Sequence, residues 1–327
     1  MKHNPQRLYF QEVATRDGFQ NEATFIETAD KIALIDELSD CGYAKIEVTS
    51  FTSPKAIPAL RDAEAVMQGI HRNPAVEYTV LVPNVRGAER ALACAIDEAN
   101  LVMSVSESHN RANLRMTRER SFEQLREVVQ VIGQSPVAVN VSLSTVFGCP
   151  MEGDIANAEV LRWVERFAEL NVRGVTLCDT TGMAYPSQVE LLCNQVRQRF
   201  PQLQLTLHFH NTRGMAQANV LAAIAAGIDR FDASLGGLGG CPYAPGASGN
   251  ACSEDLLHML ELMGYDTGVD LSKLLGVAAR LPGLVGHEVP SQVLKAGRRL
   301  DLHPTPAHVA TLDKQVAVSA GITQGAN

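Results

Sequence analysis

Short apolar runs rich in β-branched residues alternate with amphipathic stretches along most of the chain. The runs that predict strands lie at residues 8–14, 45–49, 77–82, 101–105, 137–143, 174–177, 203–209 and 230–233. The patterns that predict helices lie at residues 28–41, 63–70, 87–95, 121–132, 156–169, 186–200 and 215–226. Short apolar runs favour buried strands, whereas apolar positions that recur every three to four residues favour helices. Eight such alternations are typical of an α/β fold, the (β/α)8 or TIM barrel.

An open, doubly wound sheet is the rival architecture. In its dinucleotide-binding form that fold carries a GxGxxG motif after the first strand, and no such motif follows residues 8–14. The count of eight strands also favours a closed barrel. We expect a catalytic barrel domain at residues 1–268 and a helical appendage packed on it at 269–302. The tail, 303–327, is expected to be weakly ordered or to pack as an arm on a partner subunit.

Composition narrows the classes of function. The 327 residues are 46% hydrophobic and carry a net charge of −8, which argues against a nucleic-acid or anionic-membrane partner. Seven cysteines without a CxxC pair indicate reduced thiols in a reducing compartment. Neither a signal-peptide pattern nor an apolar stretch of the ~20 residues that a membrane span needs is present, so we expect a cytoplasmic protein. A barrel with an apolar appendage is also expected to form a homodimer or a higher homo-oligomer.

The predicted strand at residues 203–209 ends in two histidines two positions apart, His208 and His210. On an extended strand the side chains of residues i and i+2 point to the same face, so both imidazoles aim at one spot. Two imidazoles that converge at the end of a buried strand suit a divalent metal ion. Two partly buried structural histidines are the alternative interpretation.

Polar and ionisable residues follow nearly every predicted strand, where the active site of a (β/α)8 barrel forms. In chain order these residues are Glu12, Arg16, Asp17, Glu47, Thr49, Ser50, Ser106, Glu107, Ser144, Thr145, Asp179 and Thr180. After the eighth strand comes a stretch, residues 236–250, with six glycines in fifteen positions. Placement this consistent predicts a catalytic site at the carboxyl ends of the strands.

Four of the strand-end residues form a candidate ligand set for a metal ion. Asp17, His208, His210 and Asn250 supply one carboxylate, two imidazoles and one amide oxygen. A mixed oxygen and nitrogen set without thiolate suits Mg²⁺, Mn²⁺ or a similar divalent cation, with water and substrate completing the shell. The alternatives are a helix or turn cap for Asp17 and a simple turn residue for Asn250.

Two further residues have chemistry that fits such a site. Arg16 lies beside an expected metal ligand, where its permanent charge would stabilise a developing enolate oxygen. An ion pair with Glu47 or Asp179 is the alternative for this arginine. Cys241 lies in the glycine-rich stretch, which is flexible enough to close over a substrate. It would act there as a proton donor or an orienting group, or be a small buried thiol.

Longer motifs in the chain resemble the DRE-TIM metallolyases, and within them the hydroxymethylglutaryl-CoA lyase family. The similarity lies in residues 12–22 (EVATRDGFQNE), 47–55 (EVTSFTSPK), 148–153 (GCPMEG), 208–210 (HFH) and 237–255 (GLGGCPYAPGASGNACSED). The last motif is highly specific, and the resemblance covers about residues 8–268. It implies a divalent-metal-dependent retro-Claisen cleavage of an acyl-CoA substrate, 3-hydroxy-3-methylglutaryl-CoA, to acetyl-CoA and acetoacetate.

The resemblance also implies roles for single residues. In that family a metal ion chelates the substrate's hydroxyl and carboxylate. The positions that match its protein ligands are Asp17, His208, His210 and Asn250. Arg16 matches the arginine that stabilises the enolate, and Cys241 matches the loop cysteine tied to proton transfer. Asp179 and Glu47 match acids that orient or relay protons. Substrate contacts are expected from five polar residues: Gln20, Ser50, Ser144, Thr180 and Asn113.

The chain departs from the best-known members of that family near the expected acyl or CoA pocket. Ala23 stands where members close to the mitochondrial enzyme carry lysine, and Asn211 stands where they carry aspartate. The segment at residues 106–113 has an unusual core that contains His109, either a substrate contact or a solvated loop residue. These departures leave the acyl group open, so citramalyl-CoA or a longer 3-substituted glutaryl-CoA is an alternative substrate.

Two other classes of function remain as alternatives. A condensing enzyme, like the isopropylmalate and citramalate synthases, is disfavoured by the cysteine-bearing stretch at 237–250 and by the lack of a large carboxy-terminal regulatory domain. A paralogue that only binds acyl-CoA would have a broken site. The four expected metal ligands, Arg16 and Cys241 are all present, which favours an enzyme.

Overall fold

The structure is a computed structural model that describes residues 6–240 and 249–309. Eight parallel strands close into a barrel in sequence order, with β8 returning to pair with β1. They are β1 (Tyr9–Glu12), β2 (Lys45–Ser50), β3 (Glu77–Leu81), β4 (Glu98–Ser104), β5 (Ala138–Ser144), β6 (Gly174–Asp179), β7 (Gln204–Phe209) and β8 (Arg230–Ala233). The predicted (β/α)8 barrel is therefore confirmed, and the open sheet is wrong.

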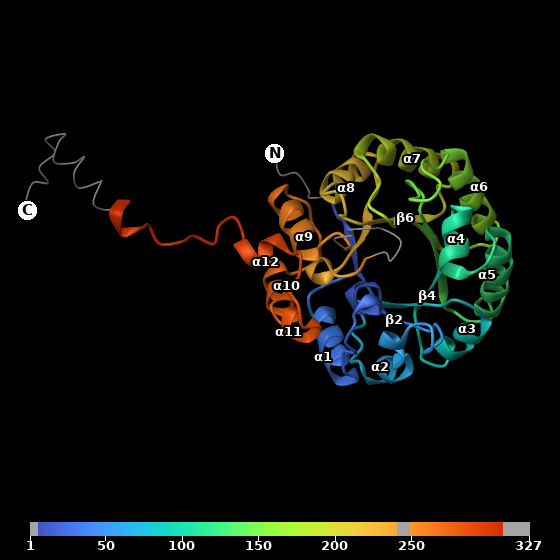
Figure 1. The fold of residues 1–327 in the computed structure, drawn as a ribbon, viewed down its shortest axis with the longest axis horizontal. Coiled ribbons are helices and arrows are strands. Elements are labelled where there is room, and N and C mark those ends of the chain that lie inside the picture. Colours follow the sequence, from blue (N-terminus) through green and yellow to red (C-terminus); the bar gives the residue numbers. More distant parts are fainter. Residues whose placement is uncertain (1–5, 241–248, 310–327) are drawn as a thin grey trace, which may run out of the picture.

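Helices form a ring around the barrel (Figure 1). Those between the strands are α1 (Thr28–Ser39), α2 (Ala63–Gly69), α3 (Val85–Leu92), α4 (Glu107–Leu114), α5 (Arg118–Ile132), α6 (Asn157–Ala168), α7 (Pro186–Arg199) and α8 (Ala216–Ala225). Those after β8 are α9 (Ser253–Leu262), α10 (Leu271–Ala278), α11 (Leu281–Val285) and α12 (Gln292–Ala296). The ring covers the outer face of the strands, which explains why strands such as β6 are buried along their whole length.

The strand boundaries differ most from the sequence pattern at β1 and β4. The strand predicted at residues 8–14 ends at Glu12, because Ala14–Gly18 forms a π-helical turn, η1, in which every residue is buried. The described part of the chain also has three short 3-10 turns: η2 (Phe19–Asn21), η3 (Pro58–Leu60) and η4 (Leu235–Gly237). β4 begins three residues earlier than the apolar run, at Glu98, and the largely polar helix α4 has no predicted counterpart.

Charged side chains gather at the amino ends of the strands. Lys45 donates to Glu98 over 2.5 Å, and Arg173 forms ion pairs with both Glu98 and Glu77. Lys45, Glu77 and Glu98 begin β2, β3 and β4, and Arg173 directly precedes β6. This end of the barrel is therefore filled by paired charges, which leaves the carboxyl ends of the strands for a site.

The helices after β8 pack against the barrel at its closing seam. α10 contacts α9 and α1, and α12 contacts α9. Gly236, at φ +66°, lies so close to these helices that a Cβ there would come within 2.7 Å of Cδ2 of Leu281. The appendage thus touches the backbone directly after β8.

Residues 297–309 extend away from the barrel (Figure 1), with Leu300 and Leu302 exposed. Most of the tail expected at 303–327, namely residues 310–327, lies outside the described residues. Within residues 6–240 and 249–309, no helix combines the length and apolar character required to cross a membrane.

Candidate active site

The π-helical turn η1 carries two adjacent, oppositely charged residues into the mouth of the barrel. Arg16 and Asp17 both lie in this turn, and each is 8% exposed. The turn packs closely against the segment after β8, because a Cβ on Gly18 would lie 3.0 Å from Cβ of Leu238. Both side chains line a cavity of about 900 Å³ at the carboxyl ends of the strands.

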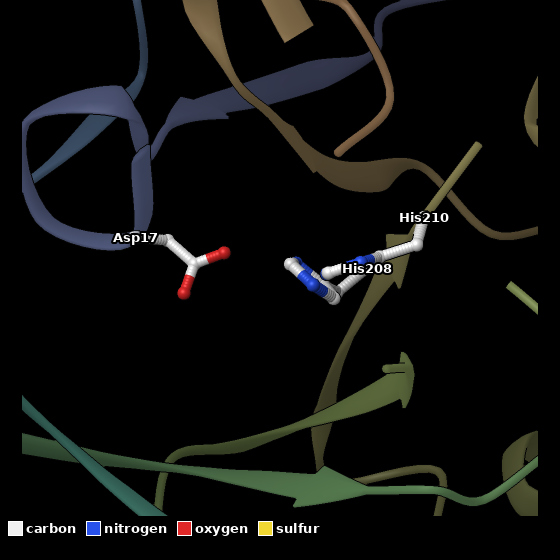
Figure 2. A group of neighbouring side chains, drawn as sticks. All are labelled: Asp17, His208 and His210. Carbon is white, nitrogen blue, oxygen red and sulfur yellow. The ribbon is translucent and has the colours of Figure 1, made fainter. Parts of the chain in front are cut away.

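Asp17 faces His208 and His210 across this cavity (Figure 2). One ligand atom from each of the three buried residues lies within 4.8 Å of the other two. His208 and His210 come from the end of β7 and the residue just beyond it, as their spacing predicts. The three side chains therefore converge on one point that a single metal ion could occupy.

Asn250 joins this group through backbone pairing. An isolated bridge pairs it with His210, and Ala251 N donates to Phe209 O over 2.8 Å. The Asn250 side chain donates from Nδ2 to Asp17 Oδ2 over 2.8 Å. Among the described residues, neither its Oδ1 atom nor Nδ1 of His210 has a hydrogen-bond partner, although both are buried. Buried unsatisfied acceptors are costly, so these atoms fit a bound cation.

The protonation states of Asp17 and His210 also suit a cation. Burial opposes ionisation of Asp17, but Arg16 and His208 outweigh it and lower its pKa to about 2. Burial, together with the charge of His208, lowers the pKa of His210 to about 3, so this imidazole is neutral. An ionised carboxylate beside a neutral imidazole is the state in which both bind a divalent ion.

His208 has a carboxylate behind it. Oδ1 of Asp232, on β8, lies 2.8 Å from Nδ1 of His208. Burial opposes protonation of His208, but Asp232 outweighs it and raises the pKa to about 9. The contact leaves Nε2 as the atom available to a metal ion. Asp232 was missed in the sequence, where its one signal is an acidic residue inside the short apolar run at 230–233.

Arg16 is held between two carboxylates. Its Nε and one terminal nitrogen each lie 2.6 Å from Oε2 of Glu47, and its other terminal nitrogen contacts Asp17. Arg16 thus forms the ion pair with Glu47 that the sequence allowed. Arg16 also lines the cavity. Burial raises the pKa of Glu47, while Arg16 opposes that shift.

Asp179 lies at the end of β6 and pairs with backbone instead of an arginine. Its Oδ1 accepts from the amides of Met183 and Ala184 at 2.7 and 3.1 Å. Its Oδ2 is buried and has no partner among the described residues. Burial raises the pKa of Asp179 to about 6, against the effect of these hydrogen bonds. The carboxyl group can therefore exchange a proton near neutral pH.

Four of the five expected substrate contacts line the same cavity as the ligand set. They are Gln20, Asn113, Ser144 and Thr180. The fifth, Ser50, is buried and donates instead to Oγ1 of Thr52 over 2.8 Å. Cys241 lies outside the described residues.

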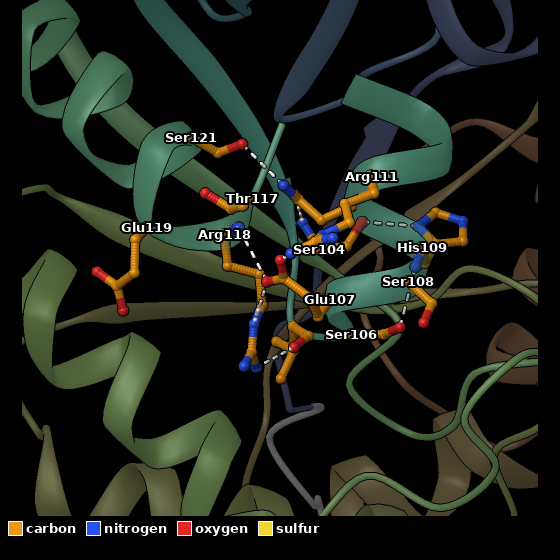
Figure 3. Close-up of polar contacts among 12 residues, drawn as sticks. Ser104, Ser106, Glu107, Ser108, His109, Arg111, Thr117, Arg118, Glu119 and Ser121 are labelled. Atoms are coloured by element: carbon orange, nitrogen blue, oxygen red, sulfur yellow. Dashed lines mark hydrogen bonds and ion pairs between the residues drawn. The ribbon is translucent and has the colours of Figure 1, made fainter. Parts of the chain in front are cut away.

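His109 is buried on the cavity wall, at 1% exposure, so the solvated-loop alternative is wrong. Its Nδ1 lies 2.7 Å from Oγ of Ser104, and its amide donates to Ser106, which caps α4 (Figure 3). Asn110 fixes the same turn by bonding to Ser104 N and to Oγ of Ser121. Burial lowers the pKa of His109, which favours the neutral form of its imidazole. Its contact with substrate stays a prediction.

Known proteins are similar to this chain in both sequence and fold. The HMGL-like family model matches residues 7–280. The hydroxymethylglutaryl-CoA lyase of Bacillus subtilis is 47% identical over 89% of this chain and 97% of its own. The (R)-citramalyl-CoA lyase of Chloroflexus aurantiacus is 38% identical over 88% of this chain and 93% of its own.

Among solved structures, an HMG-CoA lyase from Acinetobacter baumannii, in complex with coenzyme A and 3-methylmalate, superposes with a TM-score of 0.89. It is 49% identical and covers 94% of this chain and 100% of its own. The match to the family model, residues 7–280, spans the barrel, the candidate site and helices α9 and α10.

Proposed function

The chain belongs to the HMGL-like family of carbon–carbon lyases, and from this premise we propose that it cleaves 3-hydroxy-3-methylglutaryl-CoA to acetyl-CoA and acetoacetate. The observation that carries the proposal is the buried Asp17, His208 and His210 cluster, with Arg16 beside it on one cavity wall. A retro-aldol cleavage needs a way to ionise a tertiary alcohol and a positive charge near the leaving carbanion, and this arrangement offers both.

Four residues of the chain would hold the cofactor: Asp17, His208, His210 and Asn250. A divalent cation there, Mg²⁺ or Mn²⁺, would acidify the 3-hydroxyl group and neutralise the distal carboxylate of the substrate. The unsatisfied Oδ1 of Asn250 and Nδ1 of His210 support this assignment. Asp232 would orient His208 through its Nδ1.

Arg16 would stabilise the charge that develops as the bond between C2 and C3 breaks. The electron pair of that bond moves to C2 and onto the thioester oxygen, while C3 becomes the ketone of acetoacetate. The guanidinium keeps its charge at all relevant pH values, and Glu47 holds it in place from 2.6 Å. Protonation of C2 then gives acetyl-CoA.

Protons must leave the 3-hydroxyl group and reach C2. Asp179, with a pKa of about 6, is the group we assign to the proton relay, together with Glu47. Cys241 is assigned to the protonation step on the strength of the family resemblance. Gln20, Asn113, Ser144 and Thr180 would contact the substrate from the cavity wall, and Ser50 would act from behind it through Thr52.

The test is a product assay with 3-hydroxy-3-methylglutaryl-CoA and a thiol reductant, run with EDTA and after re-addition of Mg²⁺ or Mn²⁺. We expect metal-dependent release of acetyl-CoA and acetoacetate with a kcat of roughly 1 s⁻¹ or more. A protein that binds the metal but releases neither product would refute 3-hydroxy-3-methylglutaryl-CoA as the substrate. A protein that binds no metal would refute the mechanism.

Citramalyl-CoA is the second candidate substrate, because a citramalyl-CoA lyase is 38% identical to this chain. The hydroxymethylglutaryl-CoA lyase of Bacillus subtilis is more similar, at 47%, which places citramalyl-CoA second. Parallel measurement of kcat/KM on both thioesters decides between them. We also propose that the protein works as a homodimer or higher homo-oligomer in the cytoplasm, which sedimentation and cell fractionation would check.

A further inference from the structure

A chain of buried polar side chains crosses the interior of the barrel at the floor of the cavity, which Asn100, Ser142 and Thr176 line. It runs from Glu47 on β2 through Asn100 on β4 to Asn140 and Ser142 on β5 and Thr176 on β6, and none of the five is more than 8% exposed. The interiors of (β/α)8 barrels are usually filled by branched apolar side chains. Amides in this position therefore need an explanation.

Asn100 is the centre of the chain. Its Nδ2 donates to Oε1 of Glu47 over 2.8 Å. Its Oδ1 accepts from Nδ2 of Asn140 at 3.0 Å and from Oγ of Ser142 at 2.9 Å. Nδ2 of Asn140 also donates to Oγ1 of Thr176 over 2.9 Å.

The partners fix which end of the Asn100 amide faces Glu47. A reversed amide would set its NH2 group against the NH2 group of Asn140, and its oxygen against a carboxylate oxygen of Glu47. Both contacts would be repulsive, because an amide NH2 only donates and a carboxylate only accepts. The observed orientation is therefore the one that leaves every member of the chain satisfied.

The two oxygens of Glu47 have separate partners. Oε1 accepts a hydrogen bond from Nδ2 of Asn100. Oε2 lies 2.6 Å from both Nε and a terminal nitrogen of Arg16. A glutamate has three rotatable side-chain bonds, so one contact alone would let its carboxylate turn. The Asn100 bond fixes the plane of the carboxylate and thereby the plane of the guanidinium that pairs with it.

We propose that Asn100 is a positioning residue for the lyase reaction, acting on Arg16 through Glu47; this inference rests on the proposed function. Positioning within a fraction of an ångström decides how well a fixed charge stabilises a transition state. Asn100 contacts none of the four candidate metal ligands through the hydrogen bonds of the described residues. Its loss should therefore affect turnover and leave metal binding unchanged.

The experiment replaces Asn100 with aspartate, which keeps the shape and the acceptor oxygen but puts a second carboxylate oxygen against Glu47. We expect Asn100→Asp to lower kcat on 3-hydroxy-3-methylglutaryl-CoA by on the order of 10- to 100-fold, with KM and the Mn²⁺ dissociation constant within about threefold of wild type. Asn100→Ser removes the donor without adding charge. It is the variant to measure if the aspartate variant does not fold.

Asn140→Ala is the matched control, because it removes one bond from the far side of the same amide and leaves the bond to Glu47, and because Asn140 does not line the cavity. It should stay within about threefold of wild type in kcat. Equal losses in Asn140→Ala and the Asn100 variants, or a parallel loss of Mn²⁺ affinity, would overturn the inference in favour of a general structural role. Unchanged kcat in both Asn100 variants would also overturn it. An inactive wild type would instead refute the proposed function.

Discussion

Oδ1 of Asp232 lies 2.8 Å from Nδ1 of His208, so β8 supplies the carboxylate that orients an imidazole from β7. The hydrogen bond fixes the ring orientation of His208, and it leaves Nε2 as the nitrogen available to a metal ion. The neighbouring imidazole, His210, has no such carboxylate among the hydrogen bonds of the described residues. The two candidate ligands on one strand end therefore differ in basicity.

Replacing Asp232 with asparagine should weaken metal binding. The variant keeps the shape of the side chain but removes the charge that makes His208 a strong ligand, and such changes typically cost 10- to 100-fold in affinity. Calorimetric titration with Mn²⁺ measures the effect. Asp229→Asn, at a half-exposed position just before β8, is the control with the same loss of charge. Equal affinity in wild type and Asp232→Asn would show that the contact has no effect on the metal.

Metal affinity should rise with pH in the wild-type protein. His208 has a pKa of about 9 without metal, so below that pH a cation must displace a proton from its ring. The apparent dissociation constant should therefore fall about tenfold per pH unit up to pH ~9 and level off above it. In Asp232→Asn the pKa of His208 falls, and the plateau should begin at lower pH. Titrations at pH 6.5, 7.5 and 8.5 distinguish the two profiles.

Replacing Arg16 with methionine should lower kcat by on the order of a hundredfold or more, because the charge on the developing enolate loses its partner. Mn²⁺ affinity should change little, since Arg16 is not a ligand. Arg86→Met, at an exposed position on α3, controls for the loss of a positive charge. Near-normal turnover in Arg16→Met would exclude the role in enolate stabilisation.

The stability of the fold should fall between about pH 4.5 and pH 7 because of Glu12. Burial raises the pKa of this carboxyl from 4.5 to about 7, although two backbone amides, Tyr43 and Ser253 donate to it. In that window the folded protein retains a proton that the unfolded chain releases, so rising pH favours unfolding, by up to about 3 kcal/mol. Urea denaturation of wild type and Glu12→Gln at pH 5 and pH 7.5 isolates this contribution. The same pH slope in both proteins would exclude Glu12 as its source.

Gly236→Ala should destabilise the seam between barrel and appendage. Its φ of +66° is strained for alanine, and the added methyl group would meet Leu281 at 2.7 Å and Val289 at 3.1 Å. We expect a loss of about 1–3 kcal/mol, measured as a lower Tm. Gly276→Ala, in the same appendage but with no atom beyond its own helix backbone and chain neighbours within 4 Å of the new Cβ, should be neutral or slightly stabilising. A Tm unchanged in Gly236→Ala would mean that the appendage moves to accommodate the methyl group without a loss of stability.

The sequence predicts the barrel and the ligand set because both leave a local pattern. Apolar runs of strand length mark the eight strands, and the spacing of His208 and His210 marks a shared face. The sequence fails where a polar residue is buried against a partner distant in the chain. Glu98 and Asn100 precede the apolar run of β4, and only the fold brings Lys45 and Glu47 to them.

The π-helical turn η1 is the other failure. Val13 and Ala14 continue the apolar run of β1, so the pattern extends the strand past Glu12, where the structure ends it. In this turn the amides of Arg16, Asp17 and Gly18 all lie within 3.4 Å of the carbonyl oxygen of Val13. No spacing of side chains in the sequence predicts this backbone geometry. The result is that Arg16 and Asp17, although adjacent, both reach the cavity.

The contact between Asp17 and Asn250 joins residues 233 positions apart, which has a consequence for the biosynthesis of the protein. A nascent chain emerges amino terminus first, so β1 cannot pair with β8 until about 230 residues have been synthesised. Chains cut short before residue 250 lack Asn250 and therefore a complete candidate site for the cation. Metal retention by nascent chains of increasing length would therefore mark the point at which residue 250 has been added and has reached Asp17.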